Sequence, residues 1–125
     1  MSDPFFDTNI IIDWLFDHQQ AIDELSRYSR HRISRMAWAE VLAGEPPHSR
    51  LHVQTLLTSF EVVEVDQRIA QAAVDINFRT RMKMMDALIL ATAQVNGGIL
   101  ITRNTKDFAA VMPGIRIPYT LSSAS

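Results

Sequence analysis

The sequence contains no cysteine among its 125 residues, and glycine occurs at only four positions. The absence of cysteine excludes disulfide bonds, thiolate zinc sites and cysteine nucleophiles. Long hydrophobic runs are also missing, since the longest apolar runs, such as 10–12 and 99–101, have only a few residues, so no membrane span is expected. Asp3 and Asp7 fall where a secretory signal would be apolar, and we therefore expect a cytoplasmic protein.

An excess of positive charge is absent as well. Twelve Lys and Arg residues face 14 Asp and Glu residues, giving a formal net charge of −2 and a pI near 6.0. A protein that binds nucleic acid through bulk charge is basic, so a nucleic-acid contact here requires a local patch or a cation that reverses the local charge. Basic residues gather in 27–35 and 79–83. Arginine matches phosphate geometry, but a solvated helix face explains either cluster equally well.

The hydrophobic fraction of 47% and the mass of 14.2 kDa indicate one folded domain, which we place at 1–121, followed by a loose tail at 122–125. Apolar and β-branched runs predict strands at 4–6, 32–34, 61–65, 99–102 and 115–117. Apolar residues at helical spacing predict helices at 9–16, 20–30, 37–42, 49–59, 67–81, 86–95 and 107–112, with Thr8 or Asn9 capping the first. This alternation predicts an α/β fold with a parallel sheet covered on both faces.

In such sheets, ligands lie beyond the carboxyl ends of the strands. Asp7 directly follows the first predicted strand, and Asn104 and Asp107 follow the strand at 99–102. These side chains are therefore expected to reach the same edge of the sheet.

Three carboxylates stand in unusually apolar surroundings: Asp7 after Phe6, Glu40 within 37–43, and Asp86 at the start of the most apolar predicted helix. Each has a structural explanation, because Asp7 could cap a helix, Glu40 could pair with an arginine, and Asp86 could be favoured by the helix dipole. Carboxylates that converge at one edge repel one another unless protons or cations neutralise them. Mg²⁺ or Mn²⁺ suits oxygen ligands, and either ion can activate water against a phosphodiester.

Four segments in order resemble the PIN-domain ribonucleases of the VapC toxin type. They are Asp-Thr-Asn-Ile at 7–10, Trp-Ala-Glu-Val-Leu-Ala-Gly at 38–44, Asp-Ala-Leu-Ile-Leu-Ala-Thr-Ala at 86–93 and Ile-Thr-Arg-Asn-Thr-Lys-Asp-Phe at 101–108. The resemblance covers essentially the whole chain and implies a three-layer α/β/α PIN-like fold with a central, mostly parallel sheet. It also implies a Mg²⁺- or Mn²⁺-dependent endoribonuclease that leaves 5′-phosphate and 3′-hydroxyl ends.

Carried over by motif, the catalytic and metal-binding acids are Asp7, Glu40, Asp86 and Asp107. The fourth position is ambiguous, because many relatives have an acid where Asn104 stands and others have Asn there with the acid three residues later. This sequence follows the second pattern, so we expect Asp107 to join the site and Asn104 to support it by orienting a water or phosphate. Small polar residues that often support such a site are Thr8, Asn9, Ser34 and Thr102, although helix capping explains Thr8 and Ser34 at least as well. One departure is Met85, which stands where relatives usually have proline.

The resemblance further implies a VapB-like antitoxin partner, a homodimer and a hetero-oligomer of toxin with antitoxin. Apolar residues that could face such a partner are Trp14, Leu15, Phe16, Leu51, Leu56 and Leu57, although core packing explains most of them. Candidate contacts to the RNA backbone are Arg79, Arg81, Lys83, Arg103 and Lys106. The four histidines lie in polar stretches and are interpreted as surface residues.

Three alternatives remain open from the sequence. The chain could be an RNA-processing PIN nuclease without an antitoxin, or a catalytically silent PIN module that binds RNA or protein. It could also be a metal-dependent phosphohydrolase of small substrates, although the aspartyl-phosphate type has an Asp-x-Asp pair where this chain has Asp7-Thr8-Asn9. The sequence does not name the RNA target.

Overall fold

The computed structural model describes residues 2–109 and 112–121. Its centre is a five-stranded sheet in the order β3-β2-β1-β4-β5, and every neighbouring pair of strands is parallel. The strands are β1 (Pro4–Phe6), β2 (Arg32–Ser34), β3 (Glu61–Val63), β4 (Ile99–Ile101) and β5 (Ile115–Arg116). The predicted α/β class with a parallel sheet is confirmed.

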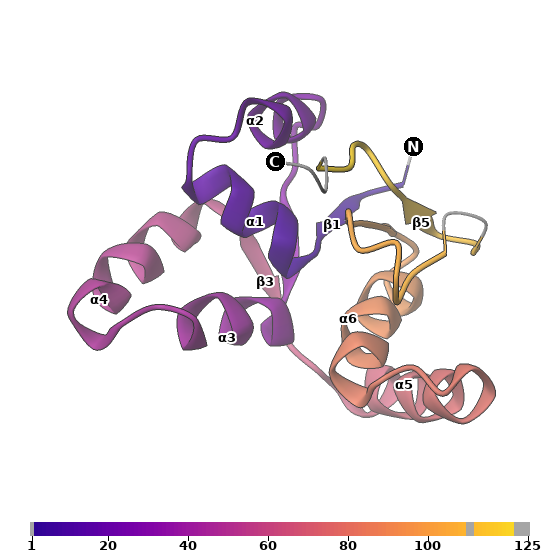
Figure 1. The fold of residues 1–125 in the computed structure, drawn as a ribbon. Coiled ribbons are helices and arrows are strands. Elements are labelled where there is room, and N and C mark those ends of the chain that lie inside the picture. The colour runs from indigo at the N-terminus through magenta and orange to yellow at the C-terminus, as the bar shows by residue number, and fades with distance from the viewer. Residues whose placement is uncertain (1, 110–111, 122–125) are drawn as a thin grey trace.

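Within the described residues, six α-helices and one short 3-10 helix connect these strands. They are α1 (Thr8–Leu15), α2 (Gln19–Ser26), α3 (Arg35–Ala43), α4 (Pro47–Leu56), η1 (Leu57–Ser59), α5 (Gln67–Thr80) and α6 (Met84–Val95). In Figure 1, α1 to α4 gather on one side of β1, and α5 and α6 lie together on the other. This division follows from right-handed crossovers, because the chain moves outward from β1 to β3 and then returns across the sheet to β4.

The strand order reverses at β1, which lies between β2 and β4. In open α/β sheets, ligands bind beyond the carboxyl ends of the strands at such a reversal of strand order. Asp7 directly follows β1 and Thr102 directly follows β4, and the backbone N–H of Asp7 donates to the carbonyl of Ile101 at 2.9 Å. The topology therefore brings the two predicted site segments together.

The core holds the sheet rigidly beneath the carboxyl ends of these strands. Phe5, Phe6, Ile33, Leu100 and Ile101 are almost completely buried. Helices α1, α3 and α6 contribute further buried side chains, among them Ile10, Ile11, Ala37, Val41, Ile89 and Leu90. Burial of this apolar surface is the main favourable term in folding, so the strand ends that carry the polar residues have a stable base.

Some predicted boundaries are wrong. Residues 107–109 and 112 are not helical, because the side chain of Asn104 bonds to Asp107 in a local turn. The first helix is capped by Asp7 rather than by Thr8 or Asn9. The predicted tail at 122–125 lies outside the described residues. Among the described residues, no helix is both long enough and apolar enough to span a membrane.

Candidate functional site at the acidic edge of the sheet

The acidic edge comprises the four acids predicted near the carboxyl ends of the strands: Asp7, Glu40, Asp86 and Asp107. Asp7 is the most buried of them, with 4% of its surface exposed. Its carboxylate accepts hydrogen bonds from the Thr102 hydroxyl at 2.7 Å and from the Thr8 backbone N–H at 2.8 Å. Burial raises the pKa of Asp7 to about 6, the two hydrogen bonds act in the opposite direction, and repulsion from Asp86 and Glu40 raises it further. The charge of Asp7 is therefore costly in the isolated chain.

Glu40 belongs to α3 and is tied to the first helix rather than to an arginine. Its Oε1 accepts a hydrogen bond from the Thr8 hydroxyl at 2.7 Å. This contact joins residues 32 positions apart and directs Glu40 toward the carboxyl end of β1. The structural alternative of an arginine partner is not observed for Glu40 among the described residues.

Asp86 lies in the first turn of α6, two residues after the helix begins. Burial raises the pKa of Asp86 above its ordinary value, and the negative charges of Asp107 and Glu40 raise it further. Lys83, just before the helix, acts in the opposite direction. Asp86 is therefore coupled electrostatically to two other acids of the edge.

Asp107 and Asn104 form a reciprocal pair after β4. The Asn104 side-chain amide donates to the Asp107 carboxylate at 2.9 Å, and the Asp107 backbone N–H donates to the Asn104 side-chain oxygen at 3.1 Å. The Asn104 backbone N–H in turn donates to the Thr102 hydroxyl at 3.0 Å. Asn104 thus connects Asp107 to the threonine that contacts Asp7.

The smaller polar residues divide into two groups. The Asn9 side-chain amide lies 3.3 Å from the Thr102 hydroxyl and 3.5 Å from the Asp7 carboxylate, within the acidic edge. Ser34 instead caps α3, because its hydroxyl accepts the Ala37 backbone N–H at 3.0 Å. Thr8, for which capping was an equal alternative, contacts Glu40 directly.

The five candidate RNA-contacting residues also differ. The Arg103 guanidinium forms an ion pair with Asp13, with bonds of 2.6 and 3.1 Å. Exposed side chains are found at Arg79, Arg81, Lys83 and Lys106. Arg81 ends α5 with a left-handed backbone, and Lys83 is the residue immediately before α6. In the arginine-rich 27–35 segment, Arg30 pairs with Asp3 and Glu61, and Arg35 pairs with Glu64.

Taken together, Asp7, Glu40, Asp86 and Asp107 form one electrostatically coupled set, because each acid perturbs or is perturbed by another. They come from four different segments of the chain. In residues 2–109 and 112–121, no three or more His, Cys, Asp or Glu side chains are already gathered as a metal-binding group. The four acids offer only carboxylate oxygens as donors, and these are the ligands that hard divalent cations prefer.

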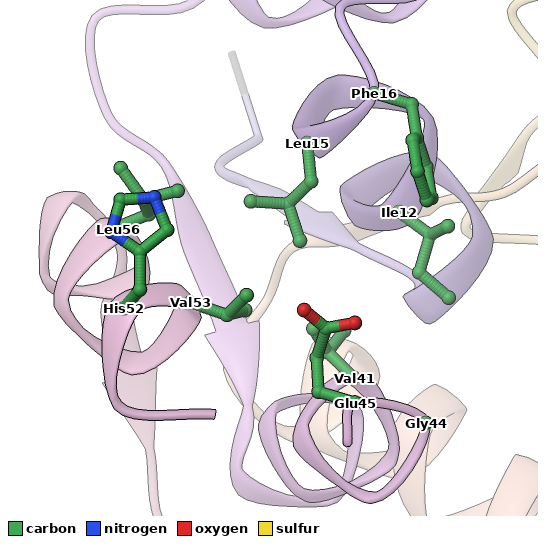
Figure 2. Close-up of a pocket in the computed structure, with 9 residues that line it drawn as sticks. All are labelled: Ile12, Leu15, Phe16, Val41, Gly44, Glu45, His52, Val53 and Leu56. Carbon is green, nitrogen blue, oxygen red and sulfur yellow. The ribbon is translucent and has the colours of Figure 1, made fainter. Parts of the chain in front are cut away.

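An apolar groove runs between α1, α3 and α4 (Figure 2). Its cavity volume is about 300 Å³, and its lining residues are Ile12, Leu15, Phe16, Val41, Gly44, Glu45, His52, Val53 and Leu56. Phe16 is 80% exposed, which is unusual for a phenyl ring. Leu57, the residue after Leu56, is instead buried in the core. The groove shares α1 and α3 with the acids.

Sequence reasoning missed a cluster of Asp13, Arg103 and Tyr119, in which Asp13 and Tyr119 are buried and Arg103 is half-buried. The Asp13 carboxylate accepts a hydrogen bond from the Tyr119 hydroxyl at 2.8 Å in addition to those from Arg103. Asp13 stands between Ile12 and Trp14, the same kind of apolar context that singled out Glu40. The interpretation of His18 and His31 as surface residues is wrong, because His18 stacks on Tyr119 and His31 packs against Phe6.

Comparisons with known proteins agree with this architecture. A model of the PIN domain matches residues 5–112. A chain of a toxin–antitoxin complex from Klebsiella pneumoniae is 37% identical, with a TM-score of 0.87 over 95% of this chain and 100% of that one. FitAcB from Neisseria gonorrhoeae (22% identity, TM-score 0.79, 95% and 100% covered) has the same fold.

DNA-bound VapBC from Salmonella typhimurium also shares the fold, with 23% identity and a TM-score of 0.77 over 93% of this chain and 96% of that one. No curated protein matches the sequence. The family match covers most of the chain and includes the segments that carry all four acids. The chain therefore belongs to the PIN-domain family.

Proposed function

We propose that this PIN domain is a Mg²⁺-dependent endoribonuclease and the toxin of a toxin–antitoxin pair. The observation that carries the catalytic part is the coupled set of acids at the carboxyl edge of the sheet. A buried carboxylate that is repelled by neighbouring acids is stabilised by a cation, and the all-oxygen donor set fits Mg²⁺ or Mn²⁺. Asp7, Glu40, Asp86 and Asp107 would hold the ion.

A bound divalent cation supplies Lewis acidity for phosphodiester hydrolysis, lowering the pKa of water and stabilising charge on the phosphate oxygens. The chain's own polar residues keep the acids ready for this role. Thr102 and the Thr8 backbone N–H favour the ionised form of Asp7, because both donate to its carboxylate. The Thr8 hydroxyl orients Glu40, and Asn104 orients Asp107.

Positive side chains near the acids provide phosphate contacts in this proposal. Lys83 lies close enough to Asp86 to lower its pKa, and it is exposed. Lys106 lies on the same segment as Asp107 and is exposed as well. These two lysines are better placed for RNA than Arg103, whose guanidinium is paired with Asp13.

Cleavage of total cellular RNA in Mg²⁺ tests the enzymatic part. The wild-type chain is expected to give discrete fragments with 5′-phosphate ends, and EDTA or the Asp7→Asn substitution is expected to abolish them. Asp75→Asn, on the exposed surface of α5, is the matched control and is expected to retain full activity. Equal cleavage by the Asp7→Asn protein, or none by folded wild type, would contradict the proposal.

The apolar groove supports the partner part of the proposal. A chain of the Klebsiella pneumoniae toxin–antitoxin complex is similar to this chain over nearly its full length. The groove of about 300 Å³ and the exposed Phe16 suit the apolar face of a helical antitoxin segment. Glu45 and His52 on the lining give that segment polar contacts beside the apolar ones (Figure 2).

Co-purification with the antitoxin of the proposed pair tests the groove. Phe16→Ser is expected to weaken the complex at least tenfold, because a central aromatic anchor carries much of the binding energy of an interface. Phe78→Ser on α5 is the matched control, since Phe78 is 82% exposed against 80% for Phe16 and lies outside the groove. Equal weakening by both variants would refute the groove as the docking site.

A further inference from the structure

Asp13 is a buried carboxylate that the proposed chemistry does not use. It lies in the last part of α1 and is 7% exposed. Its side chain accepts two hydrogen bonds from Arg103 and one from Tyr119. Burial alone would raise the pKa of Asp13, but these bonds hold it below its ordinary value, so the charge is well compensated.

Three polar connections join α1 to the segment that follows β4. Next to the strand ends, the Thr102 hydroxyl donates to Asp7 at 2.7 Å. One residue later, the Arg103 backbone N–H donates to the Asn9 side-chain oxygen at 3.3 Å. Beyond that, the Arg103 guanidinium reaches Asp13. Contacts at three points along one helix restrict both the sliding and the rotation of the segment.

Asp107 depends on this segment for its position. Within the described residues, the side-chain hydrogen bond of Asp107 comes from Asn104, which directly follows Arg103. Phe108 is fully buried and fixes the far end of the turn in the core. The near end is fixed by Arg103, so the ion pair with Asp13 completes the support of the turn that carries the fourth acid.

We propose that Asp13, Arg103 and Tyr119 form a positioning cluster that sets the turn 104–107 and thereby holds Asp107 toward Asp86. The inference rests on the proposed function, and it assigns Arg103 to positioning rather than to RNA contact. Tyr119 closes the cluster from the C-terminal side, where the His18 ring stacks on it with centroids 5.7 Å apart. None of the three side chains needs to touch the substrate for this role.

The chain contains a second cluster of the same composition that serves as an internal control. Glu24 is 4% exposed, accepts two hydrogen bonds from Arg116 at 2.7 and 3.0 Å, and accepts one from the Tyr28 hydroxyl at 2.9 Å. This cluster joins α2 to β5. Among the described residues, its side chains form no hydrogen bond with the turn 104–107. Removing either buried acid should disturb stability similarly, but only Asp13 should affect the turn.

Amide hydrogen exchange in the absence of metal tests the positioning directly. We compare Asp13→Asn with Glu24→Gln in the full chain. The urea concentration is chosen for each variant so that the two have the same free energy of unfolding. The Asp107 and Phe108 amides, both bonded to Asn104, are expected to exchange at least tenfold faster in Asp13→Asn only. If Asp13→Asn does not fold, Arg103→Lys replaces it in this test. Lysine retains the positive charge beside Asp13 but not the paired guanidinium bonds, so the same faster exchange is expected. The inference is overturned if the exchange of these two amides is unchanged in Asp13→Asn, or if it changes equally in Asp13→Asn and Glu24→Gln.

Mn²⁺ titration and RNA cleavage then test the functional consequence. Residues that orient metal ligands typically cost 10- to 100-fold in metal affinity or activity when changed. Asp13→Asn is expected to weaken Mn²⁺ binding and kcat about tenfold with KM for RNA within twofold, whereas Glu24→Gln leaves all three unchanged. Unaltered Mn²⁺ binding and kcat in Asp13→Asn would refute the role. If wild type neither binds Mn²⁺ nor cleaves RNA, the proposed function fails while the exchange experiment still decides the positioning.

Discussion

At the scale of single residues, the structure places its least favourable charge at the proposed active site. Asp7 is almost fully buried, and other acids surround it. Its hydrogen bonds from Thr102 and Thr8 offset only part of the cost of burial, since its pKa is still raised to about 6. Stored destabilisation of this kind is typical of functional sites, where a ligand provides the missing compensation.

Asp7→Asn is therefore expected to stabilise the metal-free chain while abolishing cleavage. Because the pKa is raised in the folded state from 3.8 to about 6, ionised Asp7 destabilises the fold above pH 6. The shift corresponds to a gain of at most about 3 kcal/mol at pH 7.5 in EDTA. The gain should be much smaller at pH 4, which lies far below the folded pKa of about 6 and only just above the unfolded pKa of 3.8. Urea unfolding at both pH values measures it, and a variant less stable than wild type at pH 7.5 contradicts this explanation.

At the residue level, the sequence signal for three of the proposed site residues is a charge that interrupts an apolar pattern. Asp7, Glu40 and Asp86 stood out for that reason, and the structure couples them electrostatically. The hydrogen-bond partners of these acids were harder to predict from the sequence, because the Thr8–Glu40 bond spans 32 positions. Tyr119 and Asp13 are 106 positions apart, so no local pattern reveals their contact.

At the scale of elements, the connection between α6 and β4 is held by two glycines with different constraints. A Cβ at Gly98 would lie 2.6 Å from the Phe5 ring and 2.7 Å from the Asp3 carbonyl oxygen. Gly97 has open space around it but a positive φ of 67°. Gly98 is thus required for close packing, and Gly97 is required for its backbone conformation.

Gly98→Ala is expected to cost more stability than Gly97→Ala. Overpacking against the core ring costs about 1–3 kcal/mol, because the Asp3 backbone cannot move away easily. A left-handed alanine costs about 1–2 kcal/mol and meets no neighbouring atom. Urea unfolding of the two variants measures the order, and a larger loss for Gly97→Ala contradicts the packing described for β1 and β4.

The two acid–arginine–tyrosine clusters should govern acid stability. The pKa values of Asp13 and Glu24 are lowered in the folded state despite burial, because arginine and tyrosine donate to both carboxylates. Their stabilisation is complete above the unfolded values of 3.8 and 4.5 and is lost as the pH falls through the lower folded values. Asp13→Asn and Glu24→Gln should each reduce the loss of stability between pH 5 and pH 3. Urea unfolding midpoints over this pH range measure that loss. An unchanged loss contradicts the lowered pKa values.

Elements were predictable wherever hydrophobic periodicity was strong. All five strands and the six α-helices fall within or close to the predicted ranges, because their patterns match the period of each structure. The predicted helix at 107–112 failed because the Asn104 side chain competes for the backbone N–H of Asp107. Such turn chemistry depends on neighbouring strand ends, which periodicity does not describe.

At the scale of the whole molecule, the two surfaces with proposed functions share the same helices. Helix α3 presents Glu40 to the acidic edge and Val41 to the apolar groove, and α1 likewise joins Asp7 to Ile12. A partner seated in the groove therefore contacts the helices that position the acids. The net charge of −2 is compatible with the proposed RNA substrate, because a cation bound at the acidic edge would reverse the local charge.

The parallel sheet was predictable from the alternation of strands and helices, whereas the convergence of the four acids on one cation stays a prediction. The groove was only partly visible, because Phe16 and Leu51 are exposed whereas Leu57 lies in the core. An apolar stripe in sequence does not distinguish a core face from a docking face, since both have the same helical period.

Titration calorimetry with Mn²⁺ tests the central claim most directly, namely that Asp7, Glu40, Asp86 and Asp107 form one cation site. Wild type is compared with Asp7→Asn, Glu40→Gln, Asp86→Asn and Asp107→Asn, with Asp75→Asn as the control outside the site. We predict binding by wild type and by the control, and a loss of at least tenfold in affinity for each of the four acid variants. No binding by folded wild type, or equal affinity in all variants, would contradict the account.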